Sequence, residues 1–288
     1  MTTENLTATR QDQRVAVVTG AGGALGRSHA LHLASRGMAI VVNDVADPQP
    51  VVEEVRATGG QAVGVTTGVD SQAGGEEIIA AALEEYGRLD VVVNNAGILR
   101  DKSFAKMTPE MVEAVLAVHL HGAFHVTRAA WPHLTERGGS VVMTSSGSGL
   151  YGNFGQANYA AAKMGLVGLT RTLAIEGARA GVRVNAIAPL ARSQMTEDVL
   201  PPEVLERLDP AWVSPLVAWL ADPACRLTGQ IWSVAGGRYA RVAVVEGSGV
   251  VFDHVPTVEE LAASEDGMST LEPWTEPGSL ADQVALLS

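Results

Sequence analysis

Short apolar runs recur between residues 14 and 240 and are separated by longer stretches of mixed polarity. Each run is four to six residues long, rich in valine, isoleucine or alanine, and contains at least two consecutive apolar residues. A strand buried on both faces has this composition, whereas a half-exposed strand alternates apolar and polar residues. We therefore predict buried parallel strands at 14–19, 38–42, 61–65, 89–93, 140–143, 182–187 and 230–234.

The stretches between these runs carry helix signals. Thr108 followed by Pro109 is typical of a helix start, and Gly37 is typical of a residue just after a helix end. We predict one helix from the first glycine-rich turn to residue 36 and others at 51–58, 74–86, 108–131, 158–179 and 210–220. Alternating strands and helices predict an α/β fold, a doubly wound parallel sheet of Rossmann type with helices on both faces.

Composition and charge divide the chain into three parts. Residues 1–13 are polar and are predicted to be a flexible arm, residues 14–240 a single dinucleotide-binding catalytic domain, and residues 241–288 an acidic C-terminal extension. The net charge is −12, and residues 242–288 contain nine acids but no lysine or arginine. Neither the extension nor the rest of the chain has the basic surface of a nucleic-acid-binding protein.

The 288 residues contain one cysteine, Cys225, so an internal disulfide framework is excluded. No apolar run approaches the roughly 18 residues that cross a bilayer. The first 13 residues lack the apolar region of a signal peptide. These features predict a cytoplasmic protein without a membrane span.

A glycine-rich turn follows the first predicted strand. Gly20, Gly22, Ala24, Leu25 and Gly26 lie between this strand and the next helix, and Asp44 ends the second strand 18 residues after Gly26. Strand, glycine turn, helix, strand and acid in this order are typical of dinucleotide binding. The alternative is a tight turn without a ligand.

Asp44 and Arg27 favour different cofactors. A carboxylate at the end of the second strand accepts a hydrogen bond from the ribose 2′-hydroxyl and repels a 2′-phosphate, which favours NAD. Arg27, next to the turn, could instead pair with the phosphate of NADP. We expect NAD because Asp44, at the end of the second strand, is placed to contact the ribose directly.

Three polar residues in the middle of the chain form a candidate catalytic group. Ser146 follows a predicted strand, Tyr159 comes 13 residues later, and Lys163 lies one helical turn beyond Tyr159 on the same face. An ammonium beside a phenol lowers its pKa from about 10, so the pair could exchange a proton with an alcohol or a carbonyl. The alternative is a core tyrosine, a solvated lysine and a serine at a strand end.

These motifs together resemble the short-chain dehydrogenase/reductase family over residues 14–237. The resemblance rests on the turn 19–26, on Asn94-Asn95-Ala96-Gly97, and on Ser146, Tyr159 and Lys163. It implies that Tyr159 exchanges the proton, that Ser146 orients the substrate oxygen and that Lys163 holds the nicotinamide ribose. It also implies further cofactor contacts from Asp70, Asn95, Ala96, Gly97 and Pro189.

Several longer runs resemble one subfamily, the (3R)-hydroxyacyl-CoA dehydrogenase part of the type 2 peroxisomal multifunctional enzyme and its single-domain bacterial relatives. They are residues 95–101, 118–120, 127–131, 151–159 and 173–177. The wider family often has a catalytic asparagine where this chain has His119. A histidine backbone could support the same proton relay, and a helix-packing imidazole is the alternative.

The resemblance implies oxidation of a secondary alcohol, specifically of a (3R)-3-hydroxyacyl-CoA, by NAD. We predict that Arg100, Lys102, Lys106 and Arg192 meet the CoA phosphates, with ordinary surface charge as the alternative. Candidate substrate contacts are Ser146, Tyr151, Phe154, Leu190 and Met195. A carbonyl reductase or hydroxysteroid dehydrogenase, or a catalytically silent dinucleotide-binding scaffold, remains an alternative. Family members are commonly homodimers or homotetramers.

Overall fold

A computed structural model describes residues 13–191 and 208–286 of the chain. The chain divides into two compact units, Met1–Arg241 and Val242–Ser288. The first unit holds the main sheet and all of the candidate catalytic residues, and the second holds short helices and a two-stranded sheet.

The first unit is built on an eight-stranded sheet with the order β3-β2-β1-β4-β5-β6-β7-β8. Strands β1 to β7 are parallel, and in the centre Val17 of β1 pairs with Val41 of β2 and Val92 of β4. The strands are β1 (Val15–Thr19), β2 (Ala39–Asp44), β3 (Ala62–Thr66), β4 (Val91–Asn94), β5 (Gly139–Thr144), β6 (Val182–Leu190), β7 (Ile231–Ala235) and β8 (Arg238–Val242). The predicted doubly wound parallel sheet is confirmed.

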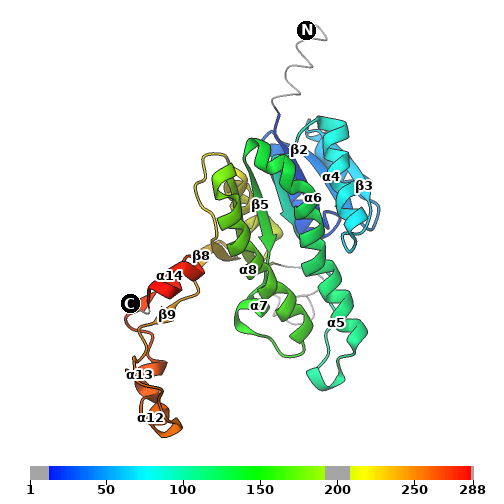
Figure 1. Ribbon diagram of the computed structural model, residues 1–288. Coiled ribbons are helices and arrows are strands. Elements are labelled where there is room, and N and C mark those ends of the chain that lie inside the picture. The colour runs from blue at the N-terminus through cyan, green and yellow to red at the C-terminus, as the bar shows by residue number, and fades with distance from the viewer. Residues whose placement is uncertain (1–12, 192–207, 287–288) are drawn as a thin grey trace. The chain divides into compact units, whose positions relative to one another are not determined.

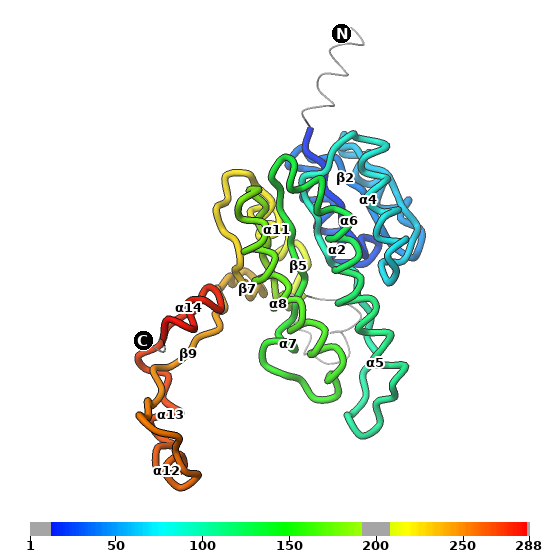
Figure 2. Tube along the Cα trace, in the orientation of Figure 1, coloured from blue at the N-terminus to red at the C-terminus, as the bar shows by residue number. Residues whose placement is uncertain are grey.

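Helices cover both faces of this sheet, as its apolar strands require. Figure 1 shows α4, α6 and α8 along one face. On the other face, Leu33 of α2, Val52 of α3 and Leu220 of α11 belong to one buried cluster with β-strand residues. The helices are α2 (Ala24–Ser35), α3 (Gln49–Ala57), α4 (Gln72–Tyr86), α5 (Pro109–Leu116), α6 (Gly122–Arg137), α7 (Gly147–Tyr151), α8 (Ala157–Gly177) and α11 (Ser214–Ala221). The course of the chain through them can be followed in Figure 2.

The predicted helix at 108–131 is interrupted. Thr108 caps α5 by accepting a hydrogen bond from the backbone N–H of Met111. A π-helical segment, η2 (Ala117–His121), then separates α5 from α6. Such wide turns are rare and occur frequently at functional sites. This one includes His119, the residue that occupies the position of the family's asparagine.

The strand order reverses between β1 and β4. The chain leaves β1 toward β2 on one side and leaves β4 toward β5 on the other. In open parallel sheets, ligands bind in the crevice beyond the carboxyl ends of the strands at this point. Gly20 follows β1 and Asn95 follows β4, so both residues lie at the edge of that crevice.

The second unit consists of short helices and strands whose side chains are mostly not buried. β9 (Glu246–Gly247) pairs with β10 (Trp274–Thr275) in antiparallel fashion. Its helices are α12 (Val258–Ala263), α13 (Glu265–Ser269) and α14 (Leu280–Ala285), and none of their residues is buried. Across both units, no helix among the described residues is long and apolar enough to cross a membrane.

Candidate active site

A cavity of about 830 Å³ lies at the carboxyl ends of the strands. It is lined by the glycine turn, by the ends of β2, β4, β5 and β6, and by the start of α8. The cavity gathers most of the site residues predicted from the sequence: Gly20, Ala24, Leu25, Gly26, Asp44, Asp70, Asn95, Ala96, Gly97, His119, Ser146, Phe154, Tyr159, Lys163, Pro189 and Leu190. Dinucleotide elements and the candidate catalytic group thus face one space.

Three predicted site residues are not among those lining the cavity. Gly22 is exposed in the glycine turn, where its backbone N–H donates to Asp44. Tyr151 is 71% exposed at the end of α7, so its predicted substrate contact finds no support in the geometry. Met195, together with the predicted cation Arg192, lies outside the described residues.

The glycines of the turn are required by close backbone approaches. Gly20 has a φ of +62°, and a Cβ there would lie 2.7 Å from Cα of Ala96. A Cβ on Gly26 would lie 2.3 Å from the carbonyl oxygen of Gly20. These contacts hold the start of α2 close against the ends of β1 and β4.

The N-terminus of α2 is suited to an anion. Gly23 provides no side-chain cap, and the first turn contains no acidic residue. The first backbone N–H groups of a helix lack partners within the helix, and their partial positive charge stabilises a phosphate. Because Ala24, Leu25 and Gly26 of this turn line the cavity, the turn fits the pyrophosphate of a dinucleotide.

A polar network fixes the turn to β4. The Asn95 side-chain amide donates to the carbonyl oxygens of Thr19 and Gly20 at 3.0 and 3.2 Å. The Thr19 hydroxyl accepts from the backbone N–H groups of Asn95 and Ala96 at 3.0 and 3.1 Å. The motif at 19–26 includes Thr19, but the sequence does not reveal that its hydroxyl joins the turn to the residues after β4.

Asp44 lies at the cavity edge with a fixed orientation. One carboxylate oxygen accepts from the backbone N–H of Gly22 at 2.9 Å, and the other accepts from Ala46 at 3.0 Å. Arg27 is turned to another partner, because its guanidinium donates two hydrogen bonds to the Glu54 carboxylate. The residues therefore fit a dinucleotide whose ribose meets Asp44.

The candidate catalytic group is assembled from β5, α7 and α8. Tyr159 and Lys163 lie one turn apart on α8, and the Lys163 ammonium is 5.5 Å from the centre of the Tyr159 ring. Lys163 is buried and donates to the carbonyl oxygen of Thr144 at 2.5 Å. Ser146 lies just beyond β5, where its hydroxyl forms a hydrogen bond with Tyr159. Serine, phenol and ammonium are therefore brought together as predicted.

Supporting hydrogen bonds hold the start of α8 in place. The Asn158 side-chain amide donates to the carbonyl oxygens of Arg100 and Met111, at 3.0 and 3.1 Å, and its oxygen accepts from the N–H of Tyr159. The Ser145 hydroxyl donates to the carbonyl oxygen of Lys163 at 2.8 Å. Several of these partners are backbone groups, whose positions no residue pattern reveals.

The electrostatics of Tyr159 differ from the sequence prediction. Burial raises the pKa of Tyr159 above its usual value, and only the hydrogen bond from Ser146 opposes this increase. Burial also lowers the pKa of Lys163 to about 7, which weakens its positive charge at neutral pH. The prediction that Lys163 lowers the Tyr159 pKa is therefore wrong for this arrangement, because it neglected the burial of both groups.

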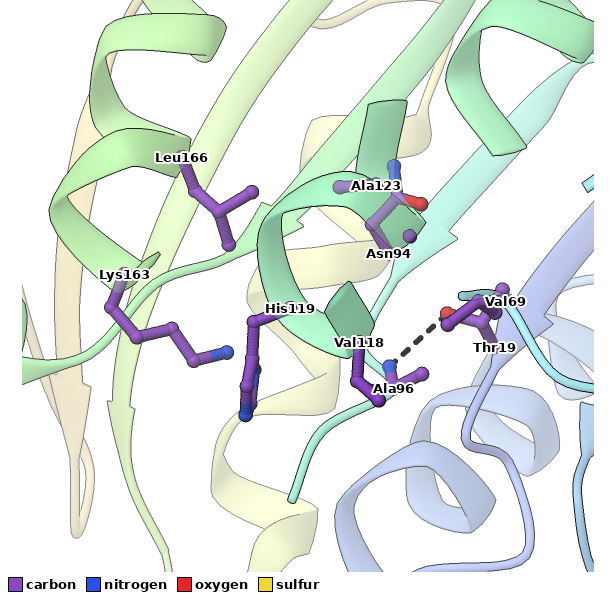
Figure 3. A pocket seen from close by; sticks show the side chains of 10 residues that line it. Thr19, Val69, Asn94, Ala96, Val118, His119, Ala123, Lys163 and Leu166 are labelled. Carbon is purple, nitrogen blue, oxygen red and sulfur yellow. Dashed lines mark hydrogen bonds between the residues drawn. The ribbon is translucent and has the colours of Figure 1, made fainter. Parts of the chain in front are cut away.

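His119 is buried beside this group and faces a second, smaller cavity of about 10 Å³. Figure 3 shows its imidazole between Lys163 on one side and Val118 and Ala96 on the other. Its Nε2 atom lies 3.0 Å from the N–H nitrogen and 2.7 Å from the carbonyl oxygen of Ile98. Burial, followed by the charge of Lys163, lowers the pKa of His119 to about 3, so the imidazole is neutral.

Comparison with known proteins agrees with this geometry. Residues 14–203 match the model of the short chain dehydrogenase family. The chain belongs to this family. A short-chain type dehydrogenase/reductase of Mycobacterium tuberculosis is 50% identical over 262 residues, which cover 87% of this chain and 92% of the relative.

Two further relatives bear on the subfamily. A hydroxyacyl-CoA dehydrogenase of Mycobacterium tuberculosis is 44% identical over 80% of either chain. The structure of the full-length peroxisomal multifunctional enzyme type 2 from Drosophila melanogaster superposes with a TM-score of 0.84 and 39% identity. That match covers 96% of this chain but only 49% of the fly protein. The predicted resemblance to multifunctional enzyme type 2 is confirmed.

Proposed function

We propose that this short-chain dehydrogenase uses NAD to interconvert a (3R)-3-hydroxyacyl-CoA and the corresponding 3-oxoacyl-CoA. The observation that carries the proposal is the shared cavity, which is lined both by the anion-binding turn with Asp44 and by Ser146, Tyr159 and Lys163. Oxidoreductase chemistry follows from family membership, and the acyl-CoA substrate is supported by the name of the mycobacterial hydroxyacyl-CoA dehydrogenase.

The chain's own groups account for the proton. The turn and Asp44 would hold NAD through its pyrophosphate and its adenosine ribose, and bound NAD would supply the acceptor for the hydride. During oxidation the Tyr159 phenolate removes the hydroxyl proton, and during reduction the Tyr159 phenol donates that proton to the substrate oxygen. Ser146 orients this oxygen through its hydroxyl and stabilises the charge that develops on it. Lys163, whose ammonium donates to the carbonyl oxygen of Thr144, would hold the hydroxyl groups of the nicotinamide ribose beside Tyr159.

Asp44 supports NAD rather than NADP. Its two oxygens are already oriented by Gly22 and Ala46, so the carboxylate needs no rearrangement to accept from a ribose hydroxyl. A 2′-phosphate at the same place would meet a like charge. Arg27, the cation that could compensate, is paired with Glu54.

A basic segment next to the cavity supports a CoA ester. Two of the chain's three lysines, Lys102 and Lys106, lie with Arg100 in residues 100–106, and all three side chains are exposed. The Lys102 N–H donates to the carbonyl oxygen of Gly155 at 2.9 Å, which ties the segment to residues 153–156. Phe154 in that stretch lines the cavity, so the three cations lie near its opening in a chain of net charge −12.

The experiment is a substrate comparison with purified protein. NADH formation is measured with the (3R) and (3S) forms of a 3-hydroxyacyl-CoA, with hydroxysteroids, and with NADP in place of NAD. We expect turnover of the (3R) ester with NAD. A preference for hydroxysteroids would instead favour the second candidate, whose substrate the apolar cavity residues Leu99 and Leu190 could also contact. No turnover of any alcohol would favour a silent scaffold.

The basic segment has its own test. Replacing Lys102 and Lys106 together by glutamine should raise the KM for the CoA ester roughly 2- to 10-fold, the effect of two exposed ion pairs. The KM for the matching N-acetylcysteamine thioester, which lacks the phosphates, should not change. Arg137→Gln removes one charge at the far end of α6 and serves as the control. Equal changes for both thioesters would contradict phosphate binding by this segment.

The compartment and the assembly state stay predictions. A cytoplasmic location is checked by fractionation of the source cells, and a homodimer or homotetramer by sedimentation of the purified chain.

A further inference from the structure

His119 contacts the two parts of the active site that must stay aligned. From η2 its imidazole reaches the backbone of Ile98, which follows the Asn94–Gly97 motif, through the two short Nε2 contacts. A neutral Nε2 can accept from the Ile98 N–H or donate to the Ile98 carbonyl, but it cannot do both at once. In either tautomer the ring remains bonded to the same residue.

The same ring is packed against Tyr159. The two ring centres are 5.1 Å apart and the rings are perpendicular, an edge-to-face arrangement that is favourable between aromatic rings. His119 is 4% exposed, so it also excludes water from this side of Tyr159. The burial that raises the Tyr159 pKa therefore depends partly on this imidazole.

Gly97 provides the space for the imidazole. A Cβ on Gly97 would lie 2.2 Å from Cε1 of His119, and the nearest atoms to it are all in this ring. The glycine of the Asn94–Gly97 motif and the histidine of η2 therefore form a complementary pair. A shorter side chain at position 119 would leave the ring's place empty.

We propose that His119 is a positioning residue, whose imidazole aligns the Ile98 backbone at the cofactor side of the cavity with the Tyr159 ring at the substrate side. The inference deepens the proposed function and rests on its assignment of Tyr159 as the proton-transferring group. The ring acts through Tyr159 and Ile98 and does not itself exchange a proton with the substrate.

Two substitutions separate the two contacts. His119→Phe keeps an aromatic ring beside Tyr159 but removes the hydrogen bond, so we expect NADH to bind about 10-fold more weakly while the pH profile of kcat is kept. His119→Gln removes the ring but keeps an amide long enough to reach the place of Nε2 and to bond to Ile98. We expect kcat to fall at least several-fold and its pH dependence to shift to lower pH, because water reaches Tyr159 and its pKa falls toward the usual value. Ser146, Lys163 and Asp101, the other groups facing Tyr159, are unchanged in both variants.

His121→Gln is the matched control. It makes the same chemical change in the same π-helical segment, but His121 is exposed. We expect its kinetics and its NADH affinity to equal those of the wild type. If the two His119 variants also stayed within twofold of wild type in kcat, in NADH affinity and in pH profile, the positioning role would be overturned.

A steric complementation test covers the case in which a His119 variant folds poorly. Gly97→Ala should weaken NADH binding because its Cβ displaces the imidazole, and His119→Ala in the same chain should restore part of this binding. If the double variant binds NADH more tightly than the sum of the two single effects predicts, the paired arrangement is supported. If the losses in NADH binding free energy simply add, the paired arrangement is contradicted. NADH binding is measured by fluorescence and needs no substrate.

The outcome for the substrate is read separately. If wild type oxidises a hydroxysteroid and not the CoA ester, the proposed substrate fails, and the His119 variants are compared on the hydroxysteroid with the same expected ratios. If wild type oxidises the CoA ester and the His119 variants behave as wild type, only the positioning role fails.

Discussion

Gly26→Ala tests how tightly the cofactor turn is built. The added Cβ would lie 2.3 Å from the Gly20 carbonyl oxygen, 2.7 Å from the Asn95 amide nitrogen and 2.8 Å from Cα of Ala21. Two of these neighbours are backbone atoms, so a shift of the Asn95 side chain alone cannot relieve the overlap. Overpacking of this kind costs about 1–3 kcal/mol, and a shifted Asn95 would lose hydrogen bonds worth about 1 kcal/mol each. The gain in helix propensity, roughly 1 kcal/mol, offsets only part of this cost.

The expected result is a net loss of about 1–3 kcal/mol in the free energy of unfolding. For a chain of this size, each kcal/mol corresponds to a fall of roughly 2–4 °C in Tm. Because the displaced turn carries the helix N-terminus, we also expect NADH binding to weaken about 10-fold or more, which corresponds to ~1.4 kcal/mol. Tm is measured by differential scanning calorimetry, and the NADH Kd by fluorescence titration.

Gly23→Ala is the control within the same turn. Gly23 has a φ of −76°, and its added Cβ would lie 3.5 Å from the Gly20 carbonyl oxygen, an ordinary contact. We expect its Tm to stay within about 2 °C of wild type, as for substitutions without a clash. If Gly26→Ala had the same Tm and NADH Kd as wild type, the described packing of the turn would be refuted.

Two further predictions concern the site, and a third concerns the buried core. Tyr159→Phe should lower kcat by about 10²–10⁴-fold while the NADH Kd changes little, and substantial remaining turnover would exclude Tyr159 as the proton-transferring group. Asp44→Ala should raise the NADP-to-NAD ratio of kcat/KM, and an unchanged ratio would contradict the role of its carboxylate. His29 is fully buried with a pKa lowered to about 3 by burial, so the unfolded chain binds its proton first, and stability is lost as pH falls from 6.5 toward 3. Each such histidine contributes a slope of up to ~1.4 kcal/mol per pH unit, and urea titrations of His29→Gln should show a smaller slope than wild type.

Most of the first unit could be predicted because its strands are apolar on both faces. The predicted strand at 14–19 corresponds to β1, and the predicted helix at 158–179 corresponds to α8, with ends shifted by one or two residues. The π-helical segment could not be predicted, because residues 117–121 carry ordinary helix-compatible side chains. The short α7 and the helices α12 and α13 of the second unit also lacked a periodic pattern long enough to identify them, whereas Ser279 indicated the cap of α14.

Residues of the candidate site can be predicted from the sequence where a reactive residue type occurs at a characteristic spacing. Ser146, Tyr159 and Lys163 are such a case, and so is the glycine turn with Asp44. The partners that fix these residues were harder to find, since the carbonyl oxygens of Thr144 and Ile98 have no signature in the sequence. The direction of the Tyr159 pKa was missed for a related reason, because burial belongs to the folded surroundings and not to the pair.

The π-helical segment η2 determines how the helical stretch from α5 to α6 would respond to the deletion of a residue. A π turn holds one more residue than an α turn, and one residue of an α-helix corresponds to a rotation of about 100°. Residues before and after η2 are therefore set to different rotational phases. His119 is directed to the active site, while Thr127, two turns later, accepts from Asn94 at the sheet. A one-residue deletion within η2 would restore a regular helix and force one of these two contacts out of phase, so the alignment of the active site with the sheet depends on a single inserted residue.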